Sequence, residues 1–240
     1  DTAEKWYFAH GLRGEDPTEP PGGAFPNPPV SHEPAIEGVF SRLQRIGLHP
    51  FRLPLALHLN EADMNASPCI RCETCDGFPC LVHAKGDAEI CGVRPALAHP
   101  NVTLNTNLKV ERLATSNDGH RVTTVHCTRD GGKESFAARV VVLAAGAVNS
   151  AAVLLSSASD AHPRGLANGS GQVGRNYMCH INSVMLGLAP WRANPTVFQK
   201  TIGVNDFYRE SGDAGFPWPL GHVQLLGKVT GKVLAAQRPR

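Results

Sequence analysis

Seven cysteines occur in the 240-residue chain, and four of them lie within one short segment. Cys69, Cys72, Cys75 and Cys80 follow the spacing C-x2-C-x2-C-x4-C in CIRCETCDGFPC. Thiolates are soft, negatively charged ligands, so closely spaced cysteines are typical of iron–sulfur or zinc sites. The overlapping C-x2-C pairs fit an iron–sulfur cluster better than zinc. Three alternatives stay open: a metal site, one or two disulfides, or free thiols in a packed loop.

The second segment that could take part in chemistry is a strand–turn–helix pattern at 140–157. The run VVVL at 140–143 predicts a fully buried strand, AAG at 144–146 a tight turn, and 147–157 a helix. Small residues let a ligand approach the backbone, and the start of a helix favours an anion or a polar cofactor edge. Ser150 is expected to cap this helix. A turn packed tightly for steric reasons alone is the alternative interpretation.

Other elements must position these two segments. Apolar residues at helical spacing predict an amphipathic helix over 35–47, ended by Gly47. Alternating apolar residues predict strands at 101–115 and 121–128, and Asp130-Gly131-Gly132 predicts a hairpin after the second. Frequent Pro and Gly predict loops at 11–34 and 160–180. After residue 180, three segments are strand-like: 181–189, 195–208 and 222–230.

Composition narrows the class of protein. Apolar residues make up 42% and charged residues 18%, an ordinary globular composition, and the net charge is +2. This balance excludes a strongly basic nucleic-acid binder as the default, so no nucleic-acid partner is expected. No apolar run is long enough to predict a membrane span. The first residues, DTAEKWYFAHGLRGEDP, do not resemble a signal peptide. Any targeting segment is expected upstream of Asp1, so no compartment is assigned.

Several segments, in the same order, resemble the glucose–methanol–choline (GMC) oxidoreductases. These segments are CDGFPCLVHAKGDAEICGVRPAL (75–97), NVTLNTNLKVERL (101–113), GAVNSAAVLLSSAS (146–159) and GLANGSGQVGRNYMCH (165–180). The resemblance implies an α/β (mixed α+β) fold. It assigns 1–100 to a loop-rich lead segment with one helix and the cysteine-rich loop. Residues 101–180 would be part of an FAD-binding domain of the two-dinucleotide-binding type with a β-meander. Residues 181–240 would begin an antiparallel-sheet substrate domain.

The resemblance also implies a cofactor and a reaction. In this family FAD accepts a hydride from the CH–OH group of an alcohol or sugar, so an FAD-dependent dehydrogenase or oxidase is expected. The cofactor-binding positions carried over are Val110, through its backbone, and Ala144, Ala145 and Gly146 of the turn. Some dehydrogenases that resemble the family carry an iron–sulfur cluster near the position of the cysteine segment. The electron acceptor is not indicated.

Two family features are missing from the chain. It lacks the N-terminal G-x-G-x-x-G and the C-terminal segment that carries the catalytic histidine, so we expect a middle portion of a longer enzyme, inactive alone. No catalytic residue is assigned, and His180 is expected to be a buried structural histidine. The competing functions are a metal-binding or electron-transfer module centred on Cys69–Cys80 and a non-catalytic scaffold.

Overall fold

The computed structural model describes residues 2–76, 78–187, 191 and 193–228. Its contacts divide the chain into two compact units, one formed by Asp1–Val102 with Leu188–Arg240 and the other by Thr103–Gly187. Each combines helix with a small antiparallel sheet, so the chain is mixed α/β. In the described residues, no helix is long and apolar enough to cross a membrane.

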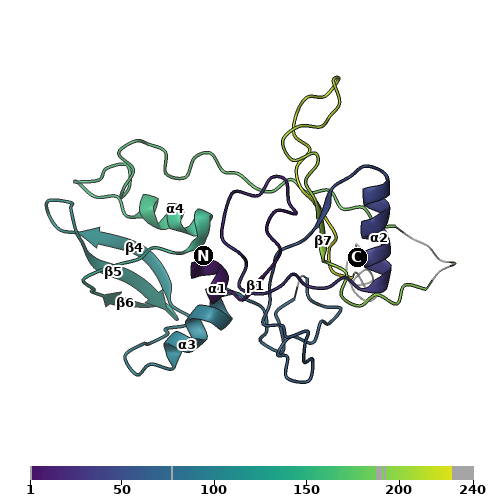
Figure 1. The fold of residues 1–240 in the computed structure, drawn as a ribbon. Coiled ribbons are helices and arrows are strands. Elements are labelled where there is room, and N and C mark those ends of the chain that lie inside the picture. The colour runs from purple at the N-terminus through teal and green to yellow at the C-terminus, as the bar shows by residue number, and fades with distance from the viewer. Residues whose placement is uncertain (1, 77, 188–190, 192, 229–240) are drawn as a thin grey trace. The chain divides into compact units, whose positions relative to one another are not determined.

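A three-stranded antiparallel meander forms the centre of the unit 103–187 (Figure 1). Its strands are β4 (Lys109–Thr115), β5 (Val122–Arg129) and β6 (Gly132–Phe136), in the order β4-β5-β6. Asp130 and Gly131 connect β5 to β6 with φ values of 49° and 80°. Two successive positive φ values are the geometry of a tight type I′ turn, and the hairpin that the Asp-Gly-Gly sequence predicted is confirmed. Residues 101–108, predicted to start the first strand, form no strand.

Helix α4 (Gly146–Ser156) packs against β4. Ser157, directly after the helix, is buried, and its Oγ accepts the backbone N–H of Leu113 at 2.8 Å. The same hydroxyl donates to the carbonyl of Val153 at 2.6 Å. Val153 and Leu113 are both buried, so one polar contact and apolar packing together hold the end of α4 on the strand. The predicted helix at 147–157 is confirmed to within one residue at each end.

The predicted buried strand at 140–143 is wrong. These residues form no strand, and the side chains of Val140 and Val142 are 71% and 82% exposed. A strand requires a neighbouring strand to satisfy its backbone, and in the part of the chain that the structure describes none pairs with this segment. The apolar run indicates a preference for burial, but burial itself depends on partners distant in sequence.

The other unit contains helix α2 (Pro34–Arg45), which the apolar spacing predicted and which lies at one side of that unit, beside β7 (Figure 1). Pro34 occupies the first turn, where its missing N–H removes no helical bond, and Gly47 follows the helix with φ +87°. The apolar face of α2 joins the core through Ile36 and Phe40, which pack with Ile202 and Val204. The sheet on this side is antiparallel, in the order β2 (Pro50–Arg52), β7 (Ile202–Val204), β8 (Val223–Gln224).

Short elements complete this unit. They are α1 (Thr2–Trp6), the pair β1 (Ala9–His10) and β3 (Leu55–Ala56), a π-helical turn η1 (Glu89–Val93) and α3 (Arg94–Leu97). A second core contains Val30, Leu57, Leu59, Cys69, Cys75, Ala84 and Phe198. Two of the clustered cysteines are thus part of a hydrophobic core. Of the predicted strand-like segments after residue 180, residues 181–187 form no strand. The segment 195–208 contains β7, and the segment 222–230 contains β8. Residues 188–190 and 229–240 lie outside the described residues.

Candidate functional site

The turn before α4 places three small, exposed residues at the start of a helix. Ala144, Ala145 and Gly146 are all exposed, and a Cβ added at Gly146 (φ +76°) would meet no atom within 4 Å. The hydroxyl of Ser150 accepts the backbone N–H of Ala145 at 3.1 Å, but Ser150 lies inside α4 and the helix has no side-chain cap, so the predicted capping role is wrong. The backbone of the turn is therefore accessible to a ligand. Such access is needed where a dinucleotide cofactor binds against the start of a helix.

Val110 lies in β4, the strand on which α4 packs. It is half-buried and pairs with Cys127 of β5, and the register shifts between Val110 and Arg112. Because β4 is at the edge of the described sheet, one side of its backbone is unpaired in that sheet. The structure thus places Val110 and the turn in one unit, in elements that flank each other. The exposed small residues of the turn leave space for a dinucleotide such as FAD.

All four clustered cysteines line one small cavity of about 120 Å³. Cys69 and Cys75 are buried, Cys72 and Cys80 are half-buried, and none of the four is in a disulfide. The rest of the lining is mostly apolar and includes Leu57, Ile70, Pro79, Leu81, Val82 and Ala84. The sequence cluster is therefore also a cluster in space.

The four thiols have different surroundings. Burial raises the pKa of Cys69 and of Cys75. Burial also opposes ionisation of Cys80, but backbone N–H groups around its sulfur outweigh burial and lower its pKa. One of these donors is the N–H of Ala84, at 3.3 Å from Sγ. Next to Cys75, the ammonium of Lys200 is 2.6 Å from a carboxylate oxygen of Asp76, so a partly buried ion pair borders the cluster.

The metal-site prediction finds no support in this arrangement. Among the described residues, no group of three or more His, Cys, Asp or Glu side chains is placed to hold a metal ion. Cys69, Cys72, Cys75 and Cys80 share a cavity lining without forming such a group. An iron–sulfur cluster at these residues stays a prediction from their spacing.

Two further results concern residues outside the predicted site. His180 is exposed, so the expectation of a buried structural histidine is wrong. A larger open cavity lies at the end of α2, where His49, Arg52 and Glu15 meet. Sequence reasoning missed this cavity because Glu15 and Arg52 are 37 residues apart and no local pattern joins them.

Comparison with known proteins gives a consistent result. The GMC oxidoreductase family matches residues 55–182, more than half of the chain. Paromamine 6'-oxidase from Streptomyces fradiae is 33% identical over an alignment of 196 residues that covers 77% of this chain and 35% of that protein. The 6'''-hydroxyparomomycin C oxidase from Streptomyces lividus is 32% identical over 166 residues, 68% of this chain and 30% of that protein.

A more distant relative covers nearly the whole chain. The gluconate 2-dehydrogenase flavoprotein from Pantoea cypripedii is 26% identical over 246 aligned residues, 93% of this chain and 39% of that protein. The chain therefore spans about a third of the length of these relatives (35%, 30% and 39%).

Proposed function

Because the chain belongs to the GMC oxidoreductase family, we propose that it is part of an FAD-dependent enzyme that oxidises the CH–OH group of an alcohol or sugar. Relatives named as an oxidase of paromamine and as a gluconate 2-dehydrogenase flavoprotein support this reaction class. The observation that carries the proposal is the match over 55–182, which contains β4, the meander, the turn and α4.

The residues proposed to hold FAD are Val110, Ala144, Ala145 and Gly146. The exposed, small-residue turn and the open space at Gly146 support this assignment, since a larger side chain there would occupy the backbone surface. Ser150 fixes the turn by accepting the N–H of Ala145. When bound, FAD supplies the acceptor for the hydride. The chain's own contribution here is to bind and orient the dinucleotide.

The test is the absorption spectrum of the purified full-length protein that contains this chain. We expect the two absorption bands of oxidised flavin, and we expect an alcohol or sugar substrate to bleach them in the absence of oxygen. Gly146→Val should reduce the flavin content, because it fills the open space and strains a positive-φ residue.

Gly169→Val is the matched control, since Gly169 has no positive φ and also faces open space. The control should retain flavin. A full-length protein that stays colourless after FAD is added would contradict the proposed function, and equal flavin loss in both variants would contradict the assignment of Gly146.

The cysteine cluster gives a second, separable prediction. If Cys69–Cys80 hold an iron–sulfur cluster, anaerobically purified protein contains iron and acid-labile sulfide, and substitution of Cys72 and Cys75 removes both. Substitution of Cys179, an exposed cysteine outside the cluster, is the control. Protein that contains neither iron nor acid-labile sulfide would contradict the iron–sulfur prediction without affecting the flavin proposal.

A further inference from the structure

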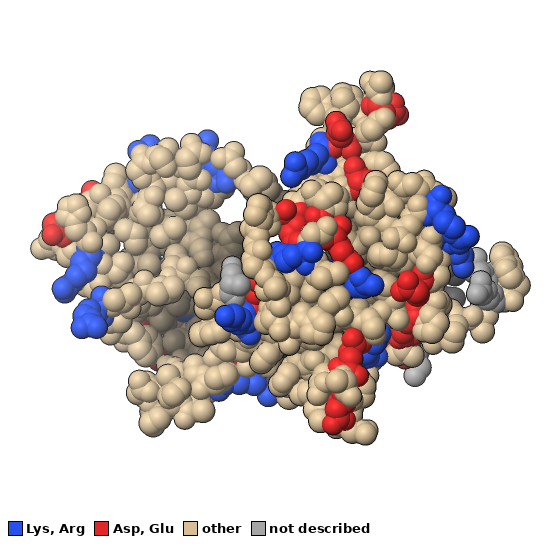
Figure 2. Space-filling view, viewed as in Figure 1, with Lys and Arg blue, Asp and Glu red and all other residues tan. Residues whose placement is uncertain are grey.

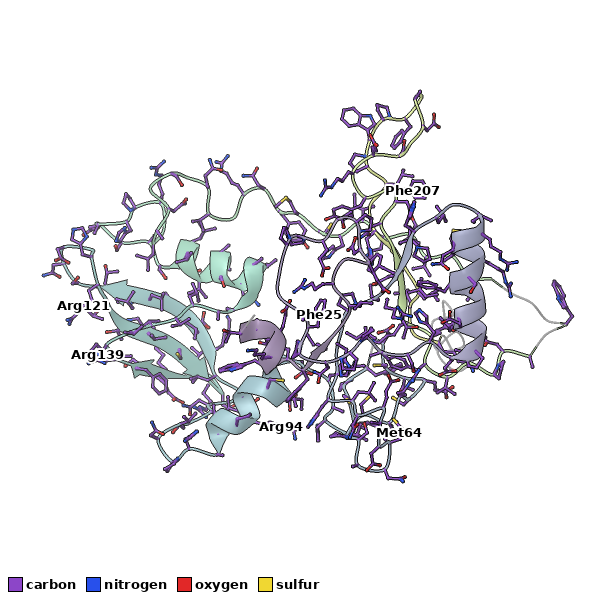
Figure 3. The ribbon with its side chains drawn as sticks, viewed as in Figure 1. Phe25, Met64, Arg94, Arg121, Arg139 and Phe207 are labelled. Carbon is purple, nitrogen blue, oxygen red and sulfur yellow. The ribbon has the colours of Figure 1, made fainter. Side chains whose placement is uncertain are left out.

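The cysteine loop, residues 69–85, carries free thiols around a small cavity of about 120 Å³. The loop belongs to the unit formed by Asp1–Val102 and Leu188–Arg240, and Met64, which Figure 3 labels, precedes it by a few residues. The cavity walls are mostly apolar, in contrast to the mixed acidic and basic surface that Figure 2 shows. A cavity of this size and lining favours a small, uncharged molecule over an ion.

Cys80 is the thiol that a molecule in this cavity can reach in a fixed position. Its side chain lines the cavity and is half-buried. The backbone N–H of Ala84 donates to Cys80 Sγ at 3.3 Å, and Ala84 is only 1% exposed. The side chain of Cys80 also packs against the apolar cluster that includes Cys69. The structure thus holds an accessible sulfur beside a buried one.

A continuous run of hydrogen bonds connects Cys69 to Cys80. The N–H of Cys69 donates to the carbonyl of His58 at 3.0 Å, and the N–H of His58 donates to the carbonyl of Ala84 at 2.8 Å. Ala84 in turn donates to the sulfur of Cys80. Cys69 is 6% exposed and lines the same cavity as Cys80. The two thiols therefore share one cavity but differ in their access to solvent.

The other two cysteines of the loop have polar neighbours of their own. Cys72 Sγ is 3.6 Å from the hydroxyl of Thr74. Lys200 hydrogen-bonds to Cys75 and forms an ion pair with Asp76. Redox-sensitive cysteines commonly combine an accessible sulfur with a second thiol that resolves the oxidised form. In this loop, Cys80 and Cys69 fit these two positions.

We propose that hydrogen peroxide converts Cys80 and Cys69 into a reversible disulfide, so that this cavity is a site of oxidative modification. The sulfur of Cys80 attacks one peroxide oxygen, the O–O bond breaks, and one water leaves a sulfenic acid behind. The sulfur of Cys69 then attacks the sulfur of Cys80; the S–S bond forms, the S–O bond breaks, and a second water leaves. Two thiols lose two electrons and two protons, and one peroxide becomes two waters.

This inference does not depend on the flavin. It excludes an iron–sulfur cluster at the same residues, because sulfurs joined in a disulfide provide no thiolate ligand for iron. Iron and acid-labile sulfide are therefore measured in the same preparation. Flavin content, measured separately by absorption, tests the proposed function alone.

The test treats the reduced full-length protein with hydrogen peroxide and maps its disulfides by mass spectrometry. Cleavage after Arg71 and before Asp76 places Cys69, the pair Cys72 and Cys75, and Cys80 on three separate peptides. We expect the Cys69 peptide to be linked to the Cys80 peptide, with the loss of two titratable thiols per chain. Dithiothreitol should reverse both changes. Because the map is made on the unchanged protein, it does not depend on the folding of a variant.

Cys80→Ser should prevent the link, and Cys72→Ser is the matched control, since Cys72 is also half-buried and lines the same cavity. The control should form the link to the same extent as the unchanged protein. The inference is overturned if the Cys69 and Cys80 peptides stay separate after peroxide treatment, if peroxide joins a different pair, or if Cys72→Ser also abolishes the link. Iron and acid-labile sulfide that are lost on substitution of these cysteines would overturn it as well.

Discussion

At the scale of single residues, nearby N–H donors decide the direction in which the pKa of a half-buried group is shifted. Burial alone would raise the pKa of Asp206 and of Cys80, yet donors lower both values: His49 for Asp206, and backbone N–H groups for Cys80. In Cys69, burial prevails over its hydrogen bond and the pKa is raised. The residue type is visible in the sequence, but its donor set is a product of the fold.

Asp206 leads to a prediction about stability and pH. Its folded pKa is lowered, so its contribution is fully present above the unfolded value, about 3.9, and is lost as the pH falls through the folded value. Asp206→Asn should cost about 1–2 kcal/mol at neutral pH and remove this acid-dependent loss. Urea unfolding at a series of pH values measures both effects.

Glu210→Gln, a change of an exposed carboxylate in the same unit, is the control and should leave the pH dependence unchanged. If Asp206→Asn retains the full acid-dependent loss of the unchanged protein, the pair with His49 does not contribute to stability.

At the scale of elements, α4 and β4 depend on one buried hydroxyl. Ser157 accepts the N–H of Leu113 and donates to Val153, so Ser157→Ala leaves a buried donor without a partner. We expect a loss of about 1–3 kcal/mol in the free energy of unfolding. Chemical denaturation measures this, with the exposed neighbour Ser156→Ala as the matched control. Equal losses in the two variants would show that the contact is unimportant.

The helices and strands also show which structural features a local sequence pattern can predict. Helices α2 and α4 and the β5–β6 hairpin were predictable, because each depends on residues within a few positions of one another. The strand at 140–143 was not, because a buried strand needs partners that its own residues do not specify. The same limit applies to β2 and β7, which pair across about 150 residues: Pro50 with Val204 and Arg52 with Ile202.

At the scale of the whole molecule, exposed apolar residues in the unit Thr103–Gly187 predict self-association of the isolated 240-residue chain. Val140, Val142, Met178, Ile181 and Met185 are all more than two-thirds exposed (71%, 82%, 87%, 96% and 97%). Light scattering should show oligomers that increase with concentration. Val140→Thr combined with Val142→Thr should reduce them, whereas Val223→Thr, in the other unit, should have a smaller effect. A chain that remains monomeric at every concentration would contradict this prediction.

The sequence by itself determined the family resemblance, the hairpin, the two main helices and the grouping of Cys69–Cys80. Each of these depends on spacing within a short segment, and the four cysteines share one cavity because their loop is short. Only the tertiary structure decided that Val140 and Val142 are exposed. It also decided that His49 contacts the carboxylate of Asp206, which is 157 residues away in the sequence. The physical reason is that short-range spacing fixes local backbone geometry, whereas burial and ion pairing depend on which distant segments the chain brings together.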